Sequence, residues 1–177
     1  MNKVIVLLIF AVVIVSAGCG EERSANEPII FIMDMCYVNS EYLSTGNEEV
    51  PAVLYFENEH FYALEGKQYF MLLDTVLREN PLGLNGVDTM ITDKIQFNSV
   101  EVVEGTAFVD IKGEGLSGSS LEEGLLISQI VNSLMGSFDE VHRVRFLVDG
   151  ETAETLMGHY DAENPYEEGI YTVWKDM

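Results

Sequence analysis

The densest group of potential metal ligands in this sequence is the segment 159–163 (HYDAE). His159, Asp161 and Glu163 alternate there with other residues, and imidazole nitrogen and carboxylate oxygen are donors that divalent cations bind. The segment lacks the spacing and the central glycine of a calcium-binding loop. A solvated acidic segment after the last strand explains these residues without a metal. We therefore predict no metal site and no cofactor.

The motifs of common hydrolases and redox enzymes are absent. The sequence contains no G-x-S-x-G, no H-E-x-x-H and no C-x-x-C pattern. Cys36 lies in an apolar run far from every histidine, which is typical of a small core residue rather than a reactive thiol. These observations predict that the protein is not an enzyme and has no catalytic residues.

One alternative stays open, because 30 acidic residues always include pairs. Two carboxyl groups could act as acid and base, or as metal or ligand contacts, in an envelope enzyme or accessory that works on cell-wall polymer. This alternative predicts a concave pocket in which several carboxyl groups converge with raised pKa values.

Two arginines stand close together near the end of the sequence. Residues 141–148 (VHRVRFLV) alternate as a strand does, with Arg143 and Arg145 on one side and Val144 and Phe146 on the other. The arginines could balance neighbouring acids on a solvated face, or they could bind an anion or a protein. On the second interpretation, Arg143 and Arg145 are the candidate partner-binding residues.

The overall charge narrows the possible partners. The 177 residues include 9 Lys and Arg against 30 Asp and Glu, so the net charge is −21. Such a chain repels phosphate groups and lacks a basic stripe, which makes nucleic acid and anionic lipid headgroups poor partners. The length suits one domain, and 47% hydrophobic residues suffice for a packed core.

The N-terminus has the pattern of a bacterial lipoprotein signal. Lys3 precedes an apolar run of 12 residues, Val4 to Val15, which is too short to span a bilayer. Ala17-Gly18-Cys19 resembles the lipobox, in which the cysteine is lipidated and begins the mature chain. We predict a signal peptide over 1–18 and a lipidated Cys19 with a polar tether over 19–27. A plain secretory peptide with an incidental cysteine is the alternative.

The first half of the folded part predicts strands and a helix. Residues 29–38 (IIFIMDMCYV) are rich in β-branched and aromatic residues, which favours a buried strand. The apolar runs 52–56 and 61–64 flank the polar residues 57–60 (ENEH), and this arrangement predicts a hairpin. Over 68–79, apolar residues at three- and four-residue spacing predict a helix with one buried face.

The second half has clearer signals. Residues 100–111 predict a hairpin whose turn is Glu104-Gly105, which would pair Val102 with Ala107 and Val100 with Val109. Ser119 and Ser120 stand three residues before Glu122 and Glu123, and this capping-box spacing predicts a helix that extends to about residue 138. The strand 141–148 follows.

These elements together predict an α+β fold. We expect a single compact domain in the order ββαββαβ, with an antiparallel or mixed sheet of about five strands packed by two helices. The glycine-rich link 113–118 lacks the spacing of a phosphate-binding loop and is expected to lead into the second helix.

Three segments resemble the GerMN domain of germination and sporulation lipoproteins: 100–111 (VEVVEGTAFVDI), 127–134 (ISQIVNSL) and 141–150 (VHRVRFLVDG). Gly158-His159-Tyr160-Asp161 with Pro165 resembles the closing segment of that family. We accordingly assign 50–166 as a GerMN-like domain, 28–49 as a strand-like lead-in and loop, and 167–177 as a C-terminal tail.

The resemblance implies a compact α+β domain tethered to the cell membrane on its extracytoplasmic face. It also implies a role in protein–protein assembly in the envelope, with other envelope proteins or with copies of the same chain, during sporulation or germination. The family offers no catalytic residues to transfer.

Overall fold

The structure is a computed structural model that describes residues 27–80 and 82–171. Along the chain, its elements are β1 (Ile29–Asn39), α1 (Ser40–Thr45), β2 (Val53–Ala63), α2 (Gln68–Met71), the π-helical η1 (Leu72–Leu77), β3 (Val87–Asp88), β4 (Phe97–Val103), β5 (Thr106–Ile111), α3 (Ser120–Ser137) and β6 (Arg143–Val148). The predicted signal peptide, Cys19 and nearly all of the tether lie outside the described residues.

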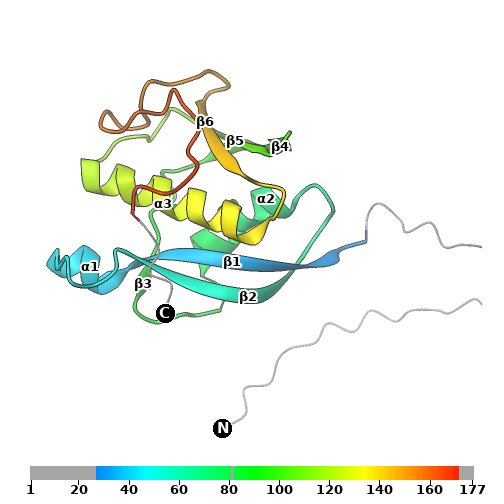
Figure 1. Ribbon diagram of the computed structural model, residues 1–177, viewed down its shortest axis with the longest axis horizontal. Coiled ribbons are helices and arrows are strands. Elements are labelled where there is room, and N and C mark those ends of the chain that lie inside the picture. The colour runs from blue at the N-terminus through cyan, green and yellow to red at the C-terminus, as the bar shows by residue number, and fades with distance from the viewer. Residues whose placement is uncertain (1–26, 81, 172–177) are drawn as a thin grey trace, which may run out of the picture.

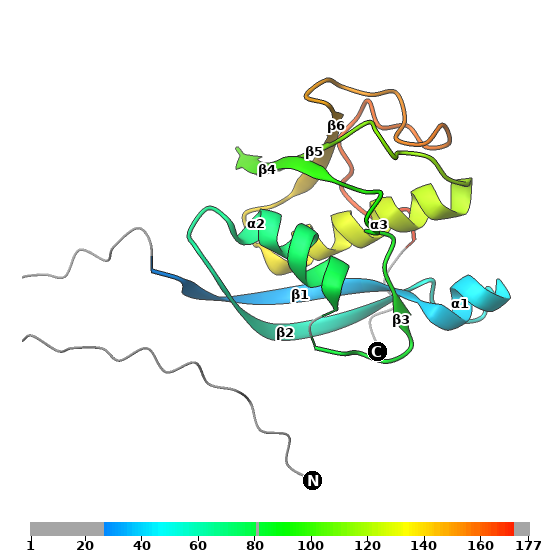
Figure 2. The same cartoon turned by 180° about the vertical axis from the view of Figure 1, so that it is seen from behind.

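The strands form two three-stranded sheets, in the orders β2-β1-β3 and β4-β5-β6. In both views α3 lies between the β1-β2 pair and the second sheet (Figures 1 and 2). The predicted α+β class is confirmed, and the second sheet is mixed because β5 pairs antiparallel with β4 and parallel with β6. The strands do not share one sheet of about five strands, because α3 packs between the two three-stranded sheets.

Serine side chains explain how a helix can lie along the part of β1 that β3 does not pair. Ser133 Oγ accepts a hydrogen bond from the Cys36 N–H at 2.8 Å. Ser137 Oγ accepts one from the Asp34 N–H at 2.9 Å and donates to the Asp34 carbonyl at 2.7 Å. The serines of α3 thus satisfy the backbone groups of Asp34 and Cys36 that a neighbouring strand would otherwise pair. At these residues β1 therefore needs no further strand beside it.

The hairpin predicted within residues 52–64 is wrong. β2 continues through residues 57–60 and pairs antiparallel with β1, with Val53 opposite Val38. The register shifts opposite Met33 to Met35, so a β-bulge absorbs one residue of the polar run where a turn was expected. Because β2 is an edge strand, its polar side chains can reach solvent while its backbone stays paired with β1.

The other local predictions agree with the structure. Both pairings predicted for the 100–111 hairpin are observed, and Glu104 and Gly105 in its turn have positive φ angles of 49° and 77°. Ser119 and Glu122 form the capping box at the start of α3. The helix expected over 68–79 is present as α2 and η1, and Leu72, Leu73, Val76 and Leu77 form its buried face.

The prediction of a buried strand over 29–38 holds for only part of β1. Residues 35–39 are buried, and Cys36 is fully inaccessible, as expected of a core cysteine. Near the start of the strand, however, Ile30 and Ile32 are more than half exposed. The apolar composition of this run is therefore not explained by the core alone.

Candidate functional site on the second sheet

β6 is an edge strand of the second sheet, and it places the two predicted arginines on the side away from the core. Val144 and Phe146 are fully buried, whereas Arg143 is exposed and Arg145 is partly exposed. The alternation predicted for residues 141–148 holds from Arg143 to Val148, whereas Val141 is buried and His142 is exposed, because the strand begins only at Arg143. Because the sheet pleats with a period of two, both guanidinium groups lie on one surface.

Side chains of three strands make up this surface, which we call the outer face. It is formed by Glu101 and Val103 of β4, Thr106, Phe108 and Asp110 of β5, and Arg143, Arg145 and Leu147 of β6. The register places Arg143 beside Thr106 and Arg145 beside Phe108. Val103 is 53% exposed. The outer face therefore combines two cations and the two acids Glu101 and Asp110 with accessible apolar side chains.

The hydrogen bonds of the arginines go to hydroxyl groups. Arg143 Nε donates to Thr106 Oγ1 at 2.7 Å, and Arg145 Nη2 donates to Thr152 Oγ1 at 3.4 Å. Within the described part of the chain, the one ion pair is between Arg78 and Asp74. Neither arginine of the outer face is thus neutralised by a described carboxylate within 4.0 Å. The arginines therefore make no close contact with a described acid, although Glu101 and Asp110 share the outer face with them.

Two acids near the end of β6, Asp110 of β5 and Asp149, accept hydrogen bonds from backbone groups. Asp110 Oδ1 accepts a hydrogen bond from the Gly150 N–H at 2.9 Å, and Asp149 Oδ2 accepts one from the Gly113 N–H at 3.1 Å. Asp149 and Gly150 have positive φ angles of 51° and 81°, as a tight Asp-Gly turn requires. These local bonds direct the two carboxylates toward backbone groups at one end of the outer face.

The potential ligands in segment 159–163 are not arranged around a common point. Asp161 Oδ1 accepts from the Glu163 N–H at 2.8 Å, and Asp161 Oδ2 accepts from Asn164 Nδ2 at 3.2 Å. His159 Nε2 lies 3.2 Å from the Gly118 carbonyl oxygen. Residues 27–80 and 82–171 contain no group of three or more His, Cys, Asp or Glu residues placed to hold a metal ion.

Glu123 is a buried acid whose role the sequence did not reveal. Its side chain on α3 is fully inaccessible, and Oε1 accepts hydrogen bonds from the N–H groups of Leu156 and Met157, both at 2.9 Å. Oε2 accepts one from the His159 N–H at 2.8 Å. The carboxylate thus holds the 156–159 loop against the helix. The sequence signal, an acid in the first turn of a capped helix, indicates only an exposed dipole contact.

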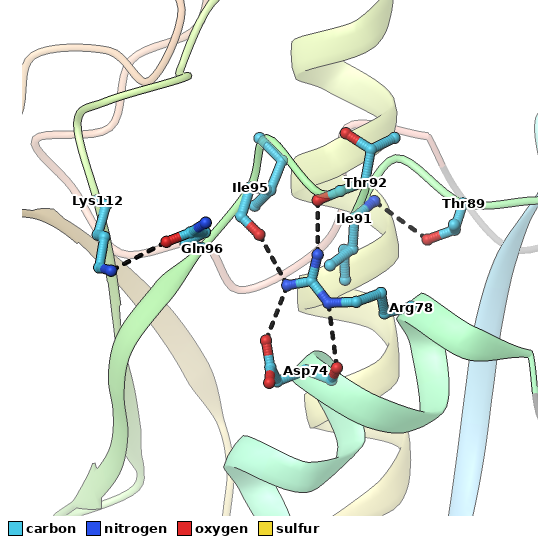
Figure 3. A network of polar contacts seen from close by, with 8 residues as sticks. All are labelled: Asp74, Arg78, Thr89, Ile91, Thr92, Ile95, Gln96 and Lys112. Carbon is cyan, nitrogen blue, oxygen red and sulfur yellow. Dashed lines mark hydrogen bonds and ion pairs between the residues drawn. The ribbon is translucent and has the colours of Figure 1, made fainter.

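Figure 3 shows a second polar cluster, whose residues Asp74, Arg78 and Lys112 also line a surface hollow of about 440 Å³. The guanidinium of Arg78 donates to the carbonyl oxygens of Thr92 at 2.6 Å and Ile95 at 2.7 Å, and to Asp74 Oδ1 at 2.8 Å. These hydrogen bonds of Arg78 therefore hold the 92–95 loop against the helix that contains η1. Lys112 Nζ donates to Gln96 Oε1 at 2.9 Å beside it.

The hollows offer little support for the acid–base alternative. Another hollow, of about 390 Å³, is lined by Met90, Leu126 and Met157 and by the two acids Asp93 and Glu122. The Ser119 backbone N–H and hydroxyl donate to the Glu122 carboxylate, and these hydrogen bonds lower its pKa. A lowered pKa is the opposite of what a general acid needs near neutral pH.

The sequence pattern of the Germane family, described as sporulation and spore germination, matches residues 37–154. The chain belongs to the Germane family. The match begins near the end of β1 and ends after β6, so it contains β2, β3, α3 and the whole second sheet with its outer face. The predicted membership of the GerMN-domain family is confirmed. Among curated proteins, none has a matching sequence.

Solved structures share the Germane-family fold of this chain. The tandem GerMN domains of the sporulation protein GerM from Bacillus subtilis superpose with a TM-score of 0.56 at 12% identity, over 81% of this chain and 46% of that chain. The first GerMN domain of the same protein superposes with a TM-score of 0.52 at 12% identity, over 79% of this chain and 96% of that domain.

A candidate lipoprotein from Clostridium perfringens also superposes, with a TM-score of 0.51 at 15% identity, over 80% of this chain and 88% of that chain. At identities this low, the superpositions establish a common fold and nothing more. In the described part of the present protein, no helix has both the length and the apolarity to cross a bilayer.

Proposed function

We propose that this Germane-family protein is a lipid-anchored protein on the extracytoplasmic face of the cell membrane. Its domain would be a non-enzymatic module for protein assembly in the envelope during sporulation or germination. Family membership and the similarity to GerM support the process, and the lipobox pattern ending at Cys19 supports the anchor.

The outer face is the contact surface in this proposal. The observation that carries it is a pair of arginines with no ion pair in the described structure, on a chain whose net charge is −21. Arginine is enriched in protein interfaces and forms planar, bidentate hydrogen bonds with carboxylates. The occupant we infer is an envelope protein with an acidic surface, whose apolar side chains pack on Val103, Phe108 and Leu147.

Electrostatics explains why the location of these cations matters. Two copies of a strongly acidic chain, or two acidic proteins, repel each other unless their contact brings opposite charges together. The outer face supplies two positive charges on one strand. Association there should be fast at low salt and should weaken as salt screens the charges.

Metabolic labelling tests the anchor separately. Radioactive or clickable palmitate should label the wild-type protein, and Cys19→Ala should abolish the label. Labelling that the substitution leaves unchanged would refute a lipid at Cys19.

Crosslinking in native membranes, followed by mass spectrometry, tests the contact surface. We expect a reproducible envelope partner with wild type and at least a tenfold loss of that crosslink in the double variant Arg143→Glu with Arg145→Glu. Lys67→Glu with Lys94→Glu is the matched control, because both lysines are exposed and the net charge changes equally. Recovery of this same chain as the partner would indicate self-assembly. Equal loss in both variants, or a monomer alone, would overturn the assignment.

A further inference from the structure

The β1-β2 pair carries an exposed apolar patch close to the N-terminal end of β1. The exposed fractions are 55% for Ile30, 53% for Ile32 and 67% for Tyr62. Tyr62 lies directly opposite Ile30, and His60 lies opposite Ile32. Directly opposed side chains on one face of an antiparallel pair are in contact range. We call these four adjacent residues the ribbon patch.

The core does not require the ribbon patch. The neighbouring residues Phe31 and Phe61 point to the other side of the two strands, where they pack against the main core. Strand alternation predicts polar side chains on the opposite side, as is usual when only one face is buried. Single exposed apolar residues are ordinary, but several adjacent ones on one face mark an interaction surface.

The rest of the same strand face is covered by the domain itself. Cys36, Val38 and Val53 pack with Leu125 of α3, and Tyr171 contacts this cluster. The N-terminal end of β1 extends beyond α3 in both views (Figures 1 and 2). The ribbon patch is the part of this face that projects past its cover.

The position of the patch along the chain points to what covers it. β1 begins at Ile29, ten residues after Cys19. Ten residues span at most about 35 Å even when fully extended. If Cys19 carries a lipid, as in the proposed function on which this inference rests, the start of β1 cannot leave the neighbourhood of the bilayer.

We propose that the ribbon patch rests on the bilayer surface, so that Ile30, Ile32 and Tyr62 together with the lipid at Cys19 hold the domain in one orientation. Tyrosine suits the headgroup region because its ring is apolar and its hydroxyl is polar, and isoleucine suits the acyl boundary beneath. A lipid anchor alone lets a domain rotate about its tether. A second, apolar contact restricts that rotation.

Charge near the patch sets the kind of lipid. Glu57 of β2 and Glu65, two residues after the end of that strand, are exposed, and Lys67 is the nearest exposed cation along the chain. Acids beside the surface are repelled by anionic headgroups. The contact therefore favours zwitterionic lipid, and phosphatidylcholine is the appropriate probe.

The test imposes the anchor chemically, so that it does not depend on natural lipidation. The chain from Cys19 onward contains every residue of the described fold, and the Cys19 thiol can be coupled to a maleimide lipid in phosphatidylcholine vesicles. Cys36 should not react, because it is fully buried and burial raises the pKa of its thiol to about 12. A tryptophan reporter, Tyr62→Trp, is placed in the patch, with Trp174→Phe to remove the natural fluorophore.

Lipids brominated on the acyl chain quench tryptophans that enter the bilayer interface. We expect the emission of the reporter at position 62 to fall to about half in brominated vesicles, since interfacial side chains lie at the headgroup–acyl boundary. Val103→Trp is the matched control, because Val103 is equally an exposed apolar residue but belongs to the other sheet. Its emission should stay unchanged. Equal emission from the two reporters in brominated vesicles would overturn the proposal.

Two further arms separate the alternatives. Ile30→Ser with Ile32→Ser should remove most of the quenching while the melting temperature stays near that of wild type, because both side chains are exposed. A second copy of the chain is the competing occupant. A dimer in analytical ultracentrifugation that these two substitutions dissociate, together with an unquenched reporter, would replace the lipid contact with a protein contact. Failure of palmitate labelling would refute the natural anchor and leave the quenching result intact.

Discussion

Replacing Glu123 with glutamine should destabilise the protein, although the side chain keeps its size. In the wild type, one carboxylate oxygen accepts two backbone hydrogen bonds and the other accepts a third, from residues 156–159. Glutamine has a single acceptor oxygen, and its NH2 group can only donate. In either orientation of the amide, at least one backbone N–H of the loop therefore faces another donor.

The size of the effect follows from burial. Glu123 is fully inaccessible, so solvent cannot replace the lost acceptor unless the loop opens. A hydrogen bond to a charged group contributes about 1.5–3 kcal/mol, and a buried donor left without a partner costs a similar amount. We expect the free energy of unfolding to fall by about 2 kcal/mol in Glu123→Gln. For a chain of this length, that change lowers the melting temperature by about 4–8 °C.

Urea unfolding and amide hydrogen exchange measure the two consequences. The urea midpoint should fall with an unchanged slope, and the amides of Leu156, Met157 and His159 should exchange faster than in wild type. Glu122→Gln is the matched control on the adjacent, exposed residue. The glutamine amide oxygen can still accept the hydrogen bond from the Ser119 N–H and only the charge is lost, so stability should change by about 0.5 kcal/mol. An unchanged midpoint with unchanged exchange at these three amides would show that the buried carboxylate does not hold the loop.

The remaining predictions concern Arg78 and Cys36. Arg78→Lys removes the planar donor group that binds the Thr92 and Ile95 carbonyls. The free energy of unfolding should therefore fall by about 1–2 kcal/mol, and the 92–95 amides should exchange faster. Equal exchange in both proteins would contradict this. Burial raises the pKa of the Cys36 thiol from 9.0 to about 12, so the native state keeps a proton that the unfolded chain releases. The resulting stability is fully present below pH 9 and declines above it, by about 1.4 kcal/mol per pH unit. Urea unfolding between pH 8 and pH 10.5 should show a shallower decline for Cys36→Ala, and identical slopes would refute the burial argument.

Features that depend on neighbouring residues in the chain could be read from the sequence. The Glu104-Gly105 turn, the Ser119 capping box and the alternation around Arg143 are each set within a few residues by backbone dihedral preferences and by side-chain periodicity. The placement of Arg143 and Arg145 on one exposed surface belongs to this class. So does family membership, since its segments are contiguous in the sequence.

Features that depend on distant residues were decided by the tertiary structure. The polar run 57–60 resembles a turn by composition, yet β1 supplies a long partner strand that keeps it extended. Ser137 bonds to Asp34 across 103 positions of the chain, and Glu123 reaches the 156–159 loop from 33 or more positions away. No local pattern encodes such pairs, because their free energy is gained only once the helix and its partners are packed together.

The apolar run at the start of β1 shows both contributions in one segment. Its composition determined that it would be a strand, because β-branched residues favour extended backbone. Only the position of α3 decided which part is covered, since the helix reaches Cys36 and Val38 but leaves Ile30 and Ile32 exposed. The sequence by itself determined the strand, and packing determined that part of it remains available for contact.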